Sequence, residues 1–175
     1  MNIRRYIANN ISSMLPPTRM YRLKALLYKW CGYSIHRTAR IVSSARIWGA
    51  GVVSIGEDTF VGHDVLILTG DAPITIGNFV DIAPRVAIVN GSHEIDMDGR
   101  HSAGEGCSKP IVIEDGVWIG AGTIILGGVS IGAKSVIAAG SVCTSNIPAG
   151  VMAAGVPCKP IKRWDRLSTQ WIRLS

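Results

Sequence analysis

The sequence predicts one all-β domain built as a solenoid of short parallel strands, and two observations, its composition and a six-residue repeat, predict it. The 175 residues include 20 glycines, 47% apolar residues and only 17% charged residues. That composition disfavours both a disordered chain and a helical bundle. An aliphatic residue recurs at every sixth position from Ile113 to Ile137. This period fits neither a helix nor an open sheet, but it fits strand-and-turn units that stack as coils.

Residues 1–33 are expected to form a helical extension ahead of the solenoid. Isoleucines recur at helical spacing in its first half, at Ile3, Ile7 and Ile11. A second helix, capped by Thr18, would carry basic residues on one face and an apolar set on the other: Leu23, Leu26, Leu27 and Trp30. Two interpretations stay open, because these helices could cover the open end of the solenoid or form a basic amphipathic surface that touches a membrane.

Residues 34–161 are expected to form the solenoid itself, with three hexads to each triangular coil. The repeated aliphatic side chains would point inward and stack on those of the neighbouring coils. They are Ile35, Ile41, Ile47, Ile55, Val61, Ile67, Ile76, Ile82, Ile88, Ile113, Ile119, Ile125, Ile131, Ile137 and, in the last place, Cys143. These hexads give about five coils. Glycines on either side of these positions, such as Gly120 and Gly122, are expected at corners that need unusual backbone angles.

A polar loop, residues 89–110, interrupts the repeat and is the candidate site. Long loops inside compact domains are uncommon and are usually functional or disordered. This loop contains His93 directly after the hexad of Ile88, where the chain leaves the rigid wall. A neutral imidazole is suited to accept a proton near neutral pH, so His93 is a candidate general base.

Residues 162–175 are expected to form a short C-terminal helix in which Trp164 and Trp171 pack rather than contact a cofactor. Before it, residues 135–158 carry no charge and are long enough to span a bilayer. A span is not expected there, because glycine and proline recur among polar residues and would leave backbone groups unsatisfied in lipid.

The charge is uneven: residues 1–56 contain nine Lys or Arg residues and no Asp or Glu. Such a patch suits phosphate-bearing ligands, anionic lipid or nucleic acid, and the pattern does not choose among them. The four cysteines form no CxxC pair, and no signal peptide is evident at the N-terminus. The expected location is therefore the cytoplasm, with the inner face of the membrane as a candidate.

Three motifs resemble the hexapeptide-repeat acyltransferases: VWIGAG at 117–122, GAKSVIAAGSV at 132–142 and AAGVPCKPIK at 153–162. The resemblance spans roughly residues 34–164 and is greatest to the maltose, galactoside and polysaccharide O-acetyltransferase branch. It implies a left-handed parallel β-helix, a homotrimer with active sites between subunits, and acetyl-CoA as co-substrate along the C-terminal coils. No metal and no nucleic acid partner are expected.

The resemblance also implies roles for individual residues. His93, in NGSHEID, matches the catalytic histidine of the family. Glu105 matches an acid that would orient His93, with Asp96 as a rival for that role. Asp71 matches an aspartate that faces the acceptor, whereas His63 stands where the family usually has an acceptor-contacting asparagine.

The cofactor contacts implied by the resemblance lie in the last coils. Small residues would leave room for the pantetheine arm, a Thr-Ser pair would lie near the CoA end, and two lysines would meet the CoA phosphates. In that order they are Ala121 and Ala139, Thr144 and Ser145, and Lys159 and Lys162. Ser145 replaces a lysine of the family pattern.

The expected function is an acetyl-CoA-dependent O-acetyltransferase that acts on a sugar hydroxyl by direct attack, in the assembly of a surface polysaccharide such as O-antigen, capsule or exopolysaccharide. Within the same chemistry, an amino-sugar N-acetyltransferase and an antibiotic acetyltransferase of the streptogramin or chloramphenicol type stay open. A zinc enzyme similar to γ-type carbonic anhydrases and a non-catalytic scaffold are the alternatives from other classes.

Overall fold

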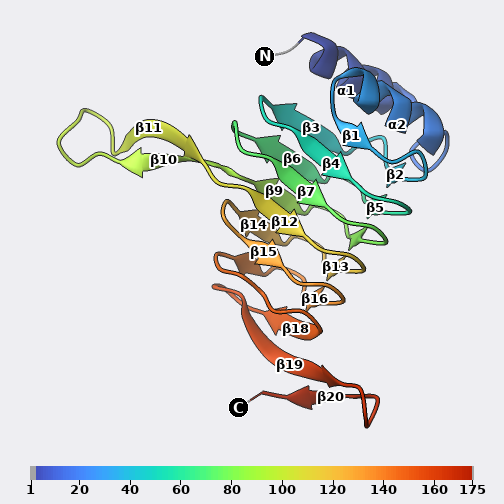
Figure 1. The fold of residues 1–175 in the computed structure, drawn as a ribbon. Helices are drawn as coiled ribbons and strands as arrows, with labels where there is room; N and C mark the ends of the chain where they lie inside the picture. The colour runs from blue at the N-terminus through green and yellow to red at the C-terminus, as the bar shows by residue number, and fades with distance from the viewer. Residues whose placement is uncertain (1–2, 175) are drawn as a thin grey trace.

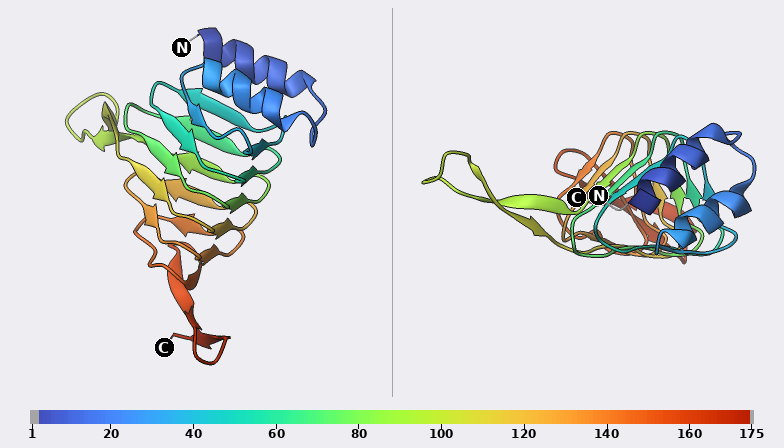
Figure 2. Two further views of the ribbon diagram at one scale, coloured as in Figure 1. Left: turned by 45° about the vertical axis from the view of Figure 1, so that its right-hand side comes forward. Right: turned by 90° about the horizontal axis from the view of Figure 1, so that it is seen from above.

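The computed structural model describes residues 3–174, and these form a three-sided parallel β-helix (Figure 1). Two helices lie side by side across one end of the solenoid, a β-hairpin extends from the other end, and a second hairpin projects sideways from the middle (Figure 2). None of the described helices is long and apolar enough to cross a membrane.

The three walls of the solenoid are sheets in which strands of successive coils pair in parallel. The first wall contains β1 (Ser34–Ile35), β4 (Val53–Ile55), β7 (Ile74–Ile76), β12 (Ile111–Ile113) and β15 (Ser130–Ile131). The second wall contains β2 (Arg40–Ile41), β5 (Phe60–Val61), β8 (Asp81–Ile82), β13 (Trp118–Ile119), β16 (Val136–Ile137) and β18 (Val151–Ala154). The third wall contains β3 (Arg46–Gly49), β6 (Leu66–Thr69), β9 (Ala87–Val89), β14 (Ile124–Leu126) and β17 (Val142–Cys143).

The repeated aliphatic positions form the core, as the six-residue period predicts. Every one of them, from Ile35 to Cys143, is at most 2% exposed. The register aligns them directly, for example Ile76 with Ile113 and Ile113 with Ile131. The first and third walls each contain five strands, one for each of the five coils expected from the hexads.

The corner glycines divide into two kinds. Gly122 has a φ of 68°, so the prediction of unusual backbone angles is confirmed there. Gly120 has no such angle. A Cβ atom on Gly120 would lie 2.5 Å from the backbone nitrogen of Ala139, so close approach of the next coil requires glycine at this position.

The N-terminal helices, α1 (Ile3–Met14) and α2 (Tyr21–Trp30), exist as expected, but they turn the opposite face to the solenoid. The predicted apolar faces are mostly outside, with Ile3 65% and Leu26 61% exposed. Buried positions include the polar side chains Asn9, Ser12 and Lys24. The helices therefore cover the open end of the solenoid (Figure 2), which is one of the two arrangements left open, but most of the leucine-rich face is not what packs there.

The reason for this reversal is the open edge of the third wall, where β3 has no strand before it. The Asn9 side chain donates to the carbonyl of Ile47 at 2.9 Å and accepts from the Ile47 N–H at 3.1 Å. The Arg5 guanidinium donates to the carbonyl of Gly49. Buried backbone groups need partners, so polar side chains of α1 replace the missing strand.

The turn between the helices is held by a buried lysine. The ammonium of Lys24 donates to the carbonyls of Pro16 and Pro17 at 2.9 and 2.8 Å, and burial lowers its pKa. Thr18 does not cap α2. The N-cap residue is Met20, in a left-handed conformation with no side-chain cap.

The C-terminal segment is a β-hairpin, so the predicted helix over residues 162–175 is wrong. Strand β19 (Lys159–Asp165) pairs antiparallel with β18 and with β20 (Gln170–Arg173), and it thereby covers the last edge of the second wall. Burial alternates along the first half of β19, as expected for a strand with one covered face. Trp164 and Trp171 pack edge to face with ring centroids 5.4 Å apart.

The interrupting loop, residues 89–110, forms the hairpin that projects from the solenoid. Strands β10 (Gly91–Ile95) and β11 (Ala103–Ser108) pair antiparallel, with an irregularity between His93 and Ile95. We call this hairpin the arm. It stands away from the walls (Figure 2), and every residue of β10 is exposed.

Candidate active site

His93 lies at the base of the arm with its ring fixed by a backbone carbonyl. Its Nδ1 atom is 2.9 Å from the carbonyl oxygen of Gly104 on β11. A carbonyl oxygen only accepts hydrogen bonds, so this contact requires the proton on Nδ1, and in the neutral ring the lone pair is then on Nε2. The hydrogen bond therefore fixes the orientation of the ring and leaves Nε2 as the nitrogen that a general base would use.

The structure corrects the expectation that a carboxylate orients His93. Within residues 3–174, neither Glu105 nor Asp96 forms a hydrogen bond with the imidazole. Asp96 instead accepts the N–H groups of Asp98 and Gly99 at 3.0 and 2.8 Å and closes the tip of the arm. A peptide carbonyl selects the same tautomer without a net charge, so a carboxylate is not needed for this purpose.

An open cavity of about 460 Å³ lies between the base of the arm and the corner that joins the third wall to the first. His93 and Asp71 both line it, so the structure brings the predicted base and one predicted acceptor contact together. Cys107 also lines it. Desolvation and the neighbouring Glu94 raise the pKa of the Cys107 thiol, so this group stays protonated near neutral pH and is a poor nucleophile.

The turn that carries Asp71 is held by two residues that the sequence pattern did not identify. The hydroxyl of Ser108 accepts the N–H groups of Asp71 and Ala72 at 3.1 and 2.9 Å. The side chain of Asn90, only 1% exposed, accepts the Gly70 N–H at 2.6 Å and donates to the Ala72 carbonyl at 2.7 Å.

A sequence signal for Asn90 existed. Side chains alternate in and out along a strand, and Asn90 lies two positions after the inward Ile88, so it is a polar residue at an inward position. Buried polar groups need partners, and its amide has them in the turn that carries Asp71.

The other predicted contacts lie along a different corner, which joins the second wall to the third. Three hydrogen bonds connect its turns: Arg85 N–H to His63 O at 2.8 Å, Gly122 N–H to Pro84 O at 3.0 Å, and Gly140 N–H to Ala121 O at 2.9 Å. His63, Ala121 and Ala139 therefore follow one another down this corner. His63 lies 3.4 Å from the hydroxyl of Ser44 and does not line the cavity at His93.

The remaining predicted cofactor residues lie at two different places, near the third wall and near the foot of the Ala139 corner. Thr144 and Ser145 are exposed after β17, on the side of the third wall that faces the first. Lys159 pairs in register with Ala154, close to the foot of the corner that carries Ala139, and Lys162 pairs with Met152. Lys159 is exposed and Lys162 is half-buried. The described chain contains no group of three or more His, Cys, Asp or Glu side chains placed to hold a metal ion.

Known proteins with similar sequences are acetyltransferases built from hexapeptide repeats. Residues 110–145 match the family model for the bacterial transferase hexapeptide. Galactoside O-acetyltransferase of Escherichia coli is 42% identical over 110 residues, which are 63% of this chain and 53% of that protein. The protein of the same name from Lactococcus lactis is 45% identical over 111 residues, with the same coverage. The chain thus spans about half the length of these curated relatives.

Solved structures cover more of the chain. A maltose O-acetyltransferase from Clostridium difficile superposes with a TM-score of 0.68 at 28% identity, over 94% of this chain and 88% of that one. A hexapeptide-repeat-containing acetyltransferase from Vibrio cholerae, in complex with acetyl coenzyme A, gives a TM-score of 0.75 at 30% identity, over 93% and 88% of the two chains. The chain belongs to the hexapeptide-repeat acetyltransferases and has their left-handed parallel β-helix.

Proposed function

We propose that this protein is an acetyl-CoA-dependent O-acetyltransferase that moves an acetyl group to a sugar hydroxyl. The observation that carries the proposal is the fixed tautomer of His93 beside Asp71 in an open cavity. A base with a free lone pair and a carboxylate that can accept hydroxyl hydrogen bonds suit a polyhydroxylated acceptor. The E. coli and L. lactis relatives carry the name galactoside O-acetyltransferase, which supports the same substrate class.

The proposed chemistry is one direct transfer. Acetyl-CoA supplies an acetyl group activated as a thioester. His93 Nε2 accepts the proton of the acceptor hydroxyl as the C–O bond forms, and the same nitrogen returns the proton to the departing sulfur as the C–S bond breaks. Asp71 holds a neighbouring hydroxyl by accepting its hydrogen bond. Glu105 forms no hydrogen bond with His93, so it is assigned no step in this transfer.

The corner that carries Ala121 and Ala139 fits the pantetheine arm. Nothing lies within 4 Å of a Cβ atom built on Gly122 or Gly140, so this edge of the solenoid is open where an extended chain would lie. Lys159 stands at the foot of the same corner, where a cation can meet a phosphate. We assign Lys162, Thr144 and Ser145 to the nucleotide end.

A homotrimer with sites between subunits accounts for the division of the predicted residues between two corners. A second copy can place its Ala139 corner against the His93 arm of the first. The third wall also exposes apolar side chains, Leu68, Ile124 and Leu126, at 38–39%, and the arm exposes Ile95 and Met97 at 80% and 79%. Exposed apolar surface of this kind marks an interface.

Subunit mixing tests this arrangement. His93→Gln removes the base and Ala139→Trp blocks the cofactor corner, so each homotrimer should be inactive. If sites form between subunits, refolded one-to-one mixtures contain sites with a wild-type arm and a wild-type corner, and about a quarter of the wild-type rate returns. No recovery would place each site within one chain.

The acceptor is tested directly with purified protein, acetyl-CoA and a panel of free sugars, nucleotide sugars, amino sugars, and streptogramin and chloramphenicol antibiotics. Mass spectrometry of the products separates O- from N-acetylation. Acetylation of amines alone would overturn the O-acetyltransferase assignment. Zinc that survives chelation would support the carbonic-anhydrase-like alternative, and equal rates for wild type and His93→Ala would contradict the proposed mechanism.

The biological role that we propose is acetylation of a surface-polysaccharide precursor in the cytoplasm, at the inner face of the membrane. The absence of acidic residues from positions 1–56 supports a location beside an anionic surface.

A further inference from the structure

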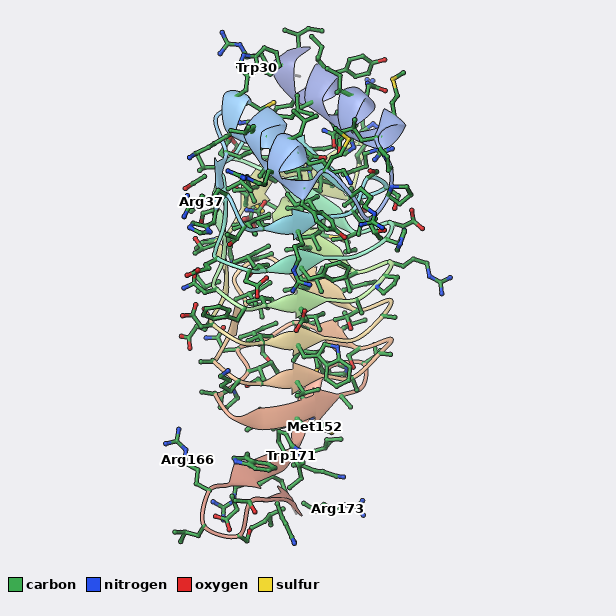
Figure 3. All side chains as sticks on the ribbon, turned by 90° about the vertical axis from the view of Figure 1, so that its right-hand side faces the viewer. Trp30, Arg37, Met152, Arg166, Trp171 and Arg173 are labelled. Carbon is green, nitrogen blue, oxygen red and sulfur yellow. The ribbon has the colours of Figure 1, made fainter. Side chains whose placement is uncertain are left out.

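The two N-terminal helices turn apolar side chains away from the protein. Because polar groups of α1 satisfy the edge of β3, several large apolar side chains of the two helices and of the turn between them are exposed. Each of the following residues is at least 46% exposed: Ile3, Tyr6, Met14, Met20, Leu26 and Trp30. We call this set the helical face. It lies at the opposite end of the molecule from Trp171 (Figure 3).

Cations surround the helical face. Arg19, Arg22 and Lys29 are exposed on α2 and the turn before it, and Arg4 lies over the ring of Trp30 with its guanidinium carbon 5.6 Å from the ring centroid. No Asp or Glu occurs before Glu57 in the sequence, so residues 1–56, which carry this face, have a net positive charge.

A small cavity lies at the edge of this face. Its volume is about 210 Å³, its apolar lining includes Leu26 and Ile35, and its cations are Arg22, Lys29 and Arg37. An apolar floor with three cations at its rim matches a ligand that joins a phosphate to a hydrocarbon chain.

We propose that the helical face docks on an anionic phospholipid bilayer, with a headgroup phosphate held by Arg22, Lys29 and Arg37. Amphipathic helices that lie in the membrane interface combine exposed apolar residues with basic residues in this way. The helices lie across the end of the solenoid (Figure 2), so both can contact one plane while the walls stay free.

Charge favours lipid over a second copy of the chain as the occupant. Two helical faces brought together would oppose cations with cations, whereas an anionic bilayer neutralises them. The third wall and the arm already provide an apolar surface for contact between copies. The proposal deepens the membrane location proposed above, but it does not depend on acetyl transfer.

Vesicle flotation with the full chain tests the proposal. Vesicles of phosphatidylcholine with 30% phosphatidylglycerol should carry the protein upward, pure phosphatidylcholine vesicles should bind it at least tenfold more weakly, and 0.5 M NaCl should release most of it. Leu26→Glu and the double variant Arg22→Glu/Lys29→Glu should each weaken binding at least tenfold. Leu167→Glu is the matched control, because Leu167 is 97% exposed in the opposite hairpin and should not affect binding.

Three results would overturn the docking. They are equal binding to both vesicle types, equal binding by Leu26→Glu and Leu167→Glu, and a smaller assembly for Leu26→Glu in light scattering without vesicles, which would make the face a contact between copies. Acetyl transfer to a soluble acceptor should be unchanged in Leu26→Glu. A failure of docking is therefore distinguishable from a failure of the proposed enzyme activity.

Discussion

Asn90→Ala should lower the stability of the protein and raise the KM for the acceptor with little change in kcat, because Asn90 positions Asp71 but does not take part in the reaction. The Asn90 side-chain amide accepts a hydrogen bond from the Gly70 N–H at 2.6 Å and donates one to the Ala72 carbonyl at 2.7 Å. Both bonds hold the turn that carries Asp71. Removing a hydrogen-bond partner from a buried polar group costs about 1–3 kcal/mol. Two such losses give roughly 2–6 kcal/mol of destabilisation, and we take about 3 kcal/mol because one amide group makes both bonds.

In a protein of this size, each kcal/mol shifts the melting temperature by roughly 2–4 °C, so Asn90→Ala should melt about 6–12 °C lower. The loosened turn moves Asp71 but leaves His93 in place. The KM for the acceptor should therefore rise about tenfold, equivalent to about 1.4 kcal/mol, while kcat changes less than about twofold.

Asn146→Ala is the matched control, because Asn146 is exposed and accepts one hydrogen bond, from Ser130 N at 2.8 Å. Water can replace the lost acceptor there, so the cost should stay below about 1 kcal/mol. Thermal melting by circular dichroism and steady-state kinetics measure both variants. If Asn90→Ala melts within about 2 °C of Asn146→Ala and keeps the wild-type KM, Asn90 does not position Asp71.

Three further predictions concern the base, the cofactor corner and alkaline stability. His93→Gln should lower kcat by about 10²–10⁴ with little change in acceptor KM, and a smaller loss in single-turnover assays would argue against a general base. Ala139→Leu should raise the KM for acetyl-CoA about tenfold without affecting the acceptor KM, whereas equal effects on both would contradict the assignment of this corner. Burial raises the pKa of Tyr28 from 10.0 to about 12, so the unfolded chain loses this proton first. Stability should be complete below pH 10 and fall as the pH approaches 12, less steeply in Tyr28→Phe, as chemical unfolding at each pH would show.

The solenoid was predictable because its physical cause is local and repeated. One inward Ile in each hexad, together with glycine at the corners, specifies a coil whose only way to bury that side chain is to stack on its neighbours. His93 was a candidate base for a related reason, since it stands where a polar loop leaves a rigid wall. The partner of its Nδ1 atom was not predictable, because a backbone carbonyl eleven residues away leaves no mark in the side-chain sequence.

The two ends of the molecule show what sequence pattern alone misjudges. Helical spacing correctly predicts α1 and α2, but it assumes that the apolar face is buried. The third wall begins with unpaired backbone groups, and satisfying them with Asn9 and Arg5 stabilises the opposite orientation. At the C-terminus, the last edge of the second wall offered the chain a strand partner, so residues 159–173 became a hairpin rather than a helix.

By itself, the sequence determined the coil, the five-layer core and the position of the interrupting loop, and it singled out His93 as a candidate base, since each follows from residue types at fixed spacing. The tertiary structure decided which predicted residues share a site. It placed Asp71 with His93 on one corner and His63 with Ala121 and Ala139 on another, because each hexad occupies one wall and each turn occupies one corner. It also decided which helical face meets the solvent, since hydrogen bonds at a sheet edge outweighed the burial of leucines.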